Sequence, residues 1–60
     1  MFSSPACVDA LEARICTNVS FWKEWRGFGV SAKGFSFEGK GRSPEAAVRD
    51  FLIRNHLESK

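Results

Sequence analysis

The central stretch of the chain, residues 18–40, reads NVSFWKEWRGFGVSAKGFSFEGK and alternates apolar with polar side chains. A period of two is typical of strands with one buried face, and glycines occur where tight hairpin turns would fit. We therefore expect two-residue turns at Arg26–Gly27 and Lys33–Gly34. The pattern predicts a three-stranded antiparallel meander, with strands at about 19–25, 28–33 and 35–40.

These turns would fix which side chains share a face of the sheet, by pairing Trp25 with Phe28 and Ala32 with Phe35. The side predicted to be covered carries Val19, Phe21, Trp25, Phe28, Val30, Ala32, Phe35 and Phe37. The side predicted to face outward carries Ser20, Trp22, Glu24, Gly29, Ser31, Lys33, Ser36, Glu38 and Lys40. Lys23 alone falls on the apolar side, where it could snorkel from an edge strand or mark a bulge.

Helical patterns flank the predicted sheet. Ser4–Pro5 favours the start of a helix over about 5–16, because Ser caps N–H groups and Pro is favoured in the first turn. Ser43–Pro44–Glu45 repeats this signal before a second helix, over about 44–57. The core stripes of the two helices are expected to be Val8, Leu11 and Ile15 in the first and Ala47, Val48, Phe51 and Leu52 in the second. We expect one α+β domain over residues 1–60, α-β-β-β-α, with both helices on one face of the sheet.

The composition fits a small folded domain with no membrane span. The chain has 60 residues, 43% of them hydrophobic, and a net charge of +2. No apolar run approaches the roughly 20 residues that cross a bilayer, and the start of the chain does not resemble an export signal, so we expect a cytoplasmic protein. Cys7 and Cys16 would lie about 13 Å apart on one helix. Because this separation is too long for a disulfide, we expect reduced thiols that fill core space.

No set of residues suggests catalysis. His56 is the only histidine and falls near the end of a helix, and the two cysteines do not have zinc-site spacing. The carboxylates are scattered singly along the chain. We therefore expect neither an enzyme nor a metal or other cofactor.

Trp22 is the sharpest functional signal, because it is the one large aromatic on the predicted outer face. Basic residues accompany it at Arg26, Lys33 and Lys40. An outward tryptophan among serines and lysines is either an anchor for a protein partner or a stacking platform for an unpaired base. Our leading prediction is a non-catalytic module, regulatory or inhibitory, that binds a larger protein through these four residues.

The stretch Gly39-Lys40-Gly41-Arg42-Ser43, followed by Ala47, resembles the junction between the third strand and the second helix of the double-stranded RNA-binding domain. That family shares the predicted α-β-β-β-α order, and the resemblance implies RNA binding through Lys40, Arg42 and Ser43. Three positions where the family carries phosphate-binding lysines are Pro44, Glu45 and Val48 here. The same junction is similar to that of small antitoxin-type and phage-encoded proteins that bind other proteins.

A second, thinner apolar line runs along the second helix, off its core stripe. It consists of Ala46, Ile53 and Leu57. A helix packed on a sheet buries only one apolar line, so the second would remain exposed. These residues therefore predict a contact between two copies of the chain in a homodimer.

Overall fold

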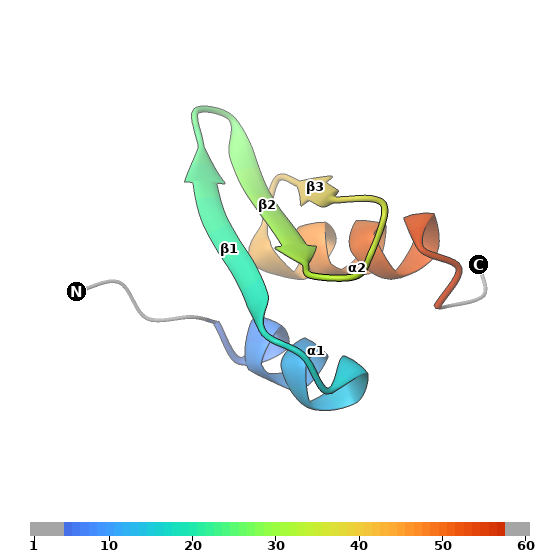
Figure 1. The fold of residues 1–60 in the computed structure, drawn as a ribbon. Helices are drawn as coiled ribbons and strands as arrows, with labels where there is room; N and C mark the ends of the chain where they lie inside the picture. Colours follow the sequence, from blue (N-terminus) through green and yellow to red (C-terminus); the bar gives the residue numbers. More distant parts are fainter. Residues whose placement is uncertain (1–4, 58–60) are drawn as a thin grey trace.

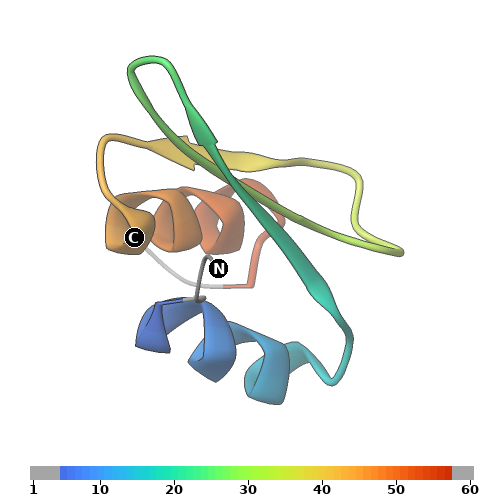
Figure 2. The same ribbon diagram turned by 90° about the vertical axis from the view of Figure 1, so that its left-hand side faces the viewer.

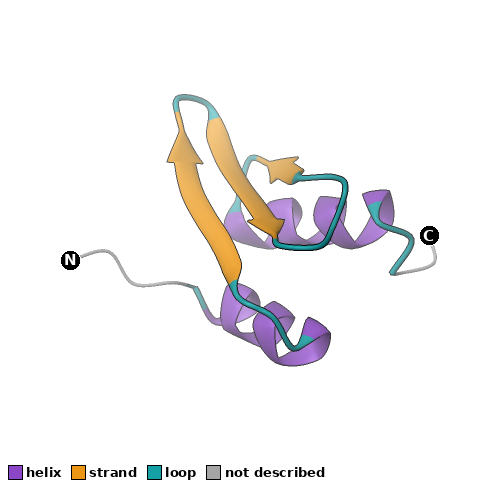
Figure 3. Ribbon diagram, in the orientation of Figure 1, coloured by secondary structure: helices purple, strands orange, loops and turns teal. Residues whose placement is uncertain are grey.

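A computed structural model describes residues 5–57 of the chain, and its helices and strands occur in the predicted order (Figure 1). The elements are α1 (Ala6–Ile15), β1 (Val19–Glu24), β2 (Gly27–Ala32), β3 (Gly39–Gly41) and α2 (Pro44–Arg54). The strands form one antiparallel sheet in the order β1-β2-β3 (Figure 3). Both helices lie on the same side of this sheet (Figure 2), so the predicted α+β fold is confirmed.

The core lies between the sheet and the two helices, and it contains the helix stripes predicted from the sequence. Its most buried large side chain is Phe51 of α2, against which Phe35 packs with 5.3 Å between the ring centroids. The buried residues are Val8 and Leu11 of α1, Val30 and Ala32 of β2, and Ala47, Val48, Phe51 and Leu52 of α2. Ile15 packs against them and is half-buried.

Helix α2 begins as predicted, with the Ser43 hydroxyl accepting a hydrogen bond from the backbone N–H of Ala46 at 3.1 Å. Helix α1 begins without a side-chain cap, after Pro5, and the predicted capping residue Ser4 lies outside the described residues. At its other end Cys16 adopts a left-handed conformation, with φ of 57°. Cys16 is exposed, so its predicted place in the core is wrong, whereas Cys7 packs against the core and both thiols are free.

Helix α2 ends at Arg54, three residues before the predicted end at Leu57. The chain leaves the helix through His56, whose φ of 60° lies in the left-handed region. Its N–H donates to the carbonyl of Ile53 at 3.1 Å, and the N–H of Leu57 donates to that of Leu52 at 2.8 Å. This pair of bonds is a Schellman motif, which satisfies the last carbonyls and folds Leu57 back onto the core.

The first hairpin turns at Trp25–Arg26, one residue earlier than predicted, so Glu24 pairs with Gly27. Gly27 does not have a positive φ. A glycine is needed at this position because a Cβ would overlap the carbonyl oxygen of Gly41 in β3. The expected pairing of Trp25 with Phe28 is therefore wrong. Since every partner shifts by two residues, an even number, the predicted faces are kept within β1 and β2, but Trp25 leaves the sheet and is exposed.

The second turn lies at Lys33–Gly34 as predicted, with Gly34 at a φ of 91° and the N–H of Phe35 donating to Ala32 at 3.2 Å. The third strand, however, does not span 35–40. Val30 faces Gly39, where the predicted register would place Phe37. A Cβ on Gly39 would already overlap the backbone of α2, so only glycine fits at this contact and residues 35–38 form a loop.

Lys23 snorkels from the inner face of β1. Pairing of β1 with β2 continues without interruption through Lys23 and Phe28, which excludes a bulge. The ammonium group lies 5.6 Å from the centroid of the Phe28 ring, and the side chain is exposed. An edge-strand lysine of this kind keeps its charge in water while its stem covers apolar surface.

Candidate functional site

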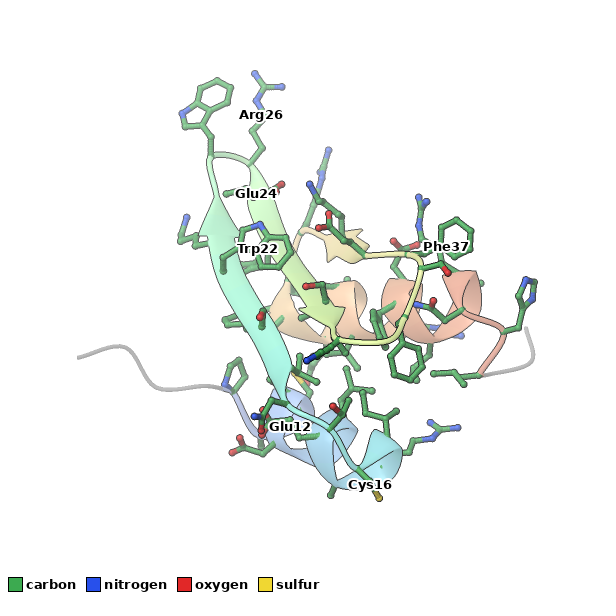
Figure 4. The ribbon with its side chains drawn as sticks, viewed as in Figure 1. Glu12, Cys16, Trp22, Glu24, Arg26 and Phe37 are labelled. Atoms are coloured by element: carbon green, nitrogen blue, oxygen red, sulfur yellow. The ribbon has the colours of Figure 1, made fainter. Side chains whose placement is uncertain are left out.

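The outer sheet face carries a small cluster of three side chains, Trp22, Glu24 and Lys40. The first two are labelled in Figure 4. The indole of Trp22 lies across Gly29 of β2 and is half-buried. Its Nε1–H donates to Oε2 of Glu24 at 2.9 Å, and Nζ of Lys40 reaches the same oxygen at 2.7 Å. This ammonium group also lies 6.0 Å from the centroid of the indole. The cluster fixes the orientation of Trp22 on the face predicted for it.

Charge pairing within this cluster holds both ionisable groups in their charged forms. The hydrogen bond from Lys40, followed by that from Trp22, lowers the pKa of Glu24 below its ordinary value of 4.5. The same bond raises the pKa of Lys40 above its ordinary value of 10.5. Lys40 is therefore charged at neutral pH, and its charge already has a carboxylate partner.

The tip of the first hairpin presents a second tryptophan. Trp25 is 85% exposed, and the guanidinium carbon of Arg26 lies 4.5 Å from the centroid of its ring. The tip projects beyond the helices in both views of the fold (Figures 1 and 2), and Figure 4 shows the Arg26 side chain pointing away from the sheet. The sequence prediction placed Trp25 on the covered face and so missed this site. A first hairpin turn placed at Trp25–Arg26 instead of Arg26–Gly27 would have predicted that Trp25 is exposed.

Phe37 is a third outward aromatic residue, 52% exposed, although the sequence predicted it to be covered. Its backbone is held by the side chain of Asn55, which follows α2. The amide oxygen of Asn55 accepts the N–H of Phe37 at 3.3 Å, and its amide nitrogen donates to the carbonyls of Phe37 and Phe51, each at 2.9 Å. These bonds fix the loop while the ring points to solvent (Figure 4).

The four residues predicted to bind a protein partner do not form one compact patch. Trp22 and Lys40 meet in the cluster described above, and Arg26 lies at the hairpin tip. Lys33 is exposed in the turn at the opposite end of β2. Lys33 follows Arg26 by seven residues, so at a strand rise of about 3.3 Å per residue the two lie about 23 Å apart. A single partner would have to cover the length of the hairpin to touch both.

The residues of the alternative nucleic-acid site are partly engaged within the protein. The Ser43 hydroxyl caps α2, and Lys40 is paired with Glu24. Arg42 is exposed and lies near the base of the hairpin tip, since a Cβ on Gly27 would come within 3.8 Å of its Cα. Of these three residues, Arg42 is the one whose side chain forms no hydrogen bond or ion pair with the rest of residues 5–57.

The predicted self-association line on α2 is divided. Leu57 packs against the core, which corrects its assignment to a free surface line. Ala46 is exposed and Ile53 is half-buried. The apolar surface left on this side of α2 is therefore smaller than the sequence predicted.

Residues 5–57 contain no cluster of three or more His, Cys, Asp or Glu side chains arranged to hold a metal ion. Within the same range, neither helix has the length and apolar character that crossing a membrane requires. No family model, curated protein or solved structure matches the chain. The function therefore has to be inferred from the chain's own residues.

Proposed function

We propose that this protein is a small non-catalytic binding module that regulates or inhibits a larger protein. Its contact surface runs from the Trp22–Glu24–Lys40 cluster on the outer sheet face to Trp25 and Arg26 at the hairpin tip. The observation that carries this proposal is the 85% exposure of Trp25. A chain of this size needs nearly all of its large apolar side chains in the core, so an indole left in water is costly unless a partner covers it.

The kinds of side chain on this surface support protein binding. Tryptophan and arginine are the residues most enriched at the energetic centres of protein interfaces, and both occur at the tip. The cluster beside the tip is already ordered, because Glu24 holds Trp22 and Lys40 through two hydrogen bonds. Order of this kind reduces the conformational entropy that binding would otherwise cost.

Pull-down experiments from an extract of the cells that make the protein, with and without nuclease, test the proposal. The bait proteins are the wild type, Trp25→Ser, and a control, Arg49→Ser, on the exposed side of α2. We expect the wild type and the control to retain the same protein after nuclease treatment, and Trp25→Ser to lose it. Circular dichroism checks that each bait is folded.

The alternative function, RNA binding through Lys40, Arg42 and Ser43, predicts a different outcome. Bound material would disappear on nuclease treatment, and binding of labelled RNA would fall steeply with salt. It would also be insensitive to Trp25→Ser if the phosphate contacts dominate. That combination of results would contradict protein binding.

A further inference from the structure

Positive charge is concentrated around the exposed tip of the hairpin. Lys23, Arg26, Lys40 and Arg42 lie on or beside it, and two acidic residues, Glu24 and Glu38, lie near Lys40. The whole chain has a net charge of +2, so these six residues account for all of its excess positive charge. The molecule therefore presents a basic end, and Trp25 projects from that end.

The cations at this end differ in what they already contact. Lys40 is paired with Glu24 at 2.7 Å, whereas Arg26 contacts the Trp25 ring and has no carboxylate partner among residues 5–57. A guanidinium stacked on an indole still directs its N–H groups outward along its edge, where a carboxylate can bind two of them. Trp25 and Arg26 thus offer an apolar surface and a bidentate cation side by side.

We infer that the tip is the anchor of the proposed interface, and that it enters an apolar pocket bordered by carboxylates on the partner protein. Trp25 fills this pocket and Arg26 pairs with a carboxylate at its edge, while Lys23 and Arg42 add longer-range attraction. This inference depends on the proposed function and names the chemistry of the partner's site.

An acidic protein fits these contacts better than a nucleic acid does. A strand of nucleic acid needs open aromatic faces for stacking and several cations for its phosphates. Here the Arg26 guanidinium lies over one face of the Trp25 ring, 4.5 Å from its centroid, and the Glu24 carboxylate lies among the basic residues and pairs with Lys40. A carboxylate on a pocket edge needs only the one unpaired guanidinium beside the indole.

Photo-cross-linking of the full chain tests this inference. A diazirine-bearing lysine analogue replaces Lys23 in one variant, Lys33 in a second and Arg49 in a third, and each is irradiated in an extract of the cells that make the protein. Lys23 is exposed beside the tip, so this probe leaves both Trp25 and Arg26 in place. We expect position 23 to form an adduct with one protein, resistant to nuclease, whose cross-linked peptide contains Asp or Glu. Position 49, on the far side of α2, is the background control.

Binding constants for the cross-linked protein, once purified, complete the test. Trp25→Ser and Arg26→Gln should each weaken binding by about tenfold or more, and the effect of Arg26→Gln should shrink as salt is added. Wild-type affinity in Trp25→Ser, or a contact peptide without acidic residues, would overturn the inference.

The adduct pattern separates failure of this inference from failure of the proposed function. An adduct from position 33 with none from position 23 would overturn the inference and leave binding by the outer face intact. Adducts with nucleic acid, or no adduct from either position 23 or position 33, would overturn both.

Discussion

Trp22 and Gly29 face each other across the first hairpin, and the indole fills the space that a side chain at position 29 would need. A Cβ on Gly29 would overlap atoms in both rings of the indole. An aromatic ring laid over a facing glycine protects the strand backbone and buries part of the ring. The two tryptophans therefore differ in role: Trp22 is part of the sheet's structure, and Trp25 is free for contact.

This difference predicts opposite stability effects for two alanine substitutions. Trp22→Ala removes a half-buried ring and its bond to Glu24, and should lower the free energy of unfolding by about 2 kcal/mol, less than for a fully buried tryptophan. Trp25→Ala should change it by no more than about 0.5 kcal/mol. Urea unfolding measures both. Equal losses in the two variants would contradict the assignment.

The contact between β3 and α2 predicts that Gly39 is intolerant of any side chain. Gly39→Ala should destabilise the fold by about 1–3 kcal/mol, because the methyl group would meet the α2 backbone, which cannot rotate away. The matched control is Gly34→Asn in the second turn. Nothing lies within 4 Å of a Cβ there, and Asn tolerates a positive φ, so a loss below about 1 kcal/mol is expected. Thermal unfolding compares the two variants. Unchanged stability in Gly39→Ala would contradict the prediction and would mean that β3 and α2 leave room for a methyl group.

The left-handed residue at the end of α2 predicts a stabilising substitution. His56 holds a φ of 60°, which costs a non-glycine residue about 1 kcal/mol. His56→Gly should therefore raise the free energy of unfolding by up to about 1 kcal/mol, net of the entropy that glycine loses. Arg49→Gly, inside the helix, should lower it by about 1 kcal/mol. A lower free energy of unfolding for His56→Gly would contradict this prediction. It would mean that the contacts of the imidazole stabilise the fold by more than the left-handed φ costs.

The Glu24–Lys40 pair predicts a stability difference that depends on pH. Because the pKa of Glu24 is lowered, its carboxylate stabilises the fold above its ordinary pKa of 4.5, and this contribution is lost as the pH falls through the lowered value. The pKa of Lys40 is raised, so its contribution is lost only as the pH rises above 10.5. Wild type and Glu24→Gln should differ in stability at neutral pH and converge in acid. A constant difference down to acid pH, or one unaffected by Lys40→Met, would contradict this coupling.

The sequence was sufficient to predict the order of elements, the core stripes of the helices and the outward direction of Trp22. These features depend on local periodicity. The predicted direction of Trp22 is correct although the predicted register is not. The strand partners differ from the predicted ones by two residues, and side chains return to the same face every two residues.

The turn position and the third strand could not be predicted, because both depend on contacts between distant parts of the chain. Gly27 and Gly39 looked like turn or strand glycines, but each is needed where another backbone comes too close for a Cβ. Phe37 is exposed because Asn55, eighteen residues later, holds its backbone. No local pattern contains such information, and the exposed Trp25 was missed for the same reason.

Acrylamide quenching of Trp25 fluorescence in the Trp22→Phe variant, without and with the purified partner, tests the central claim most directly. The claim is that a partner protein covers the hairpin tip. We predict that Trp25 is quenched almost as freely as tryptophan in water when the protein is alone, and is strongly shielded in the complex. Unchanged quenching of Trp25 in a fully formed complex would contradict the claim.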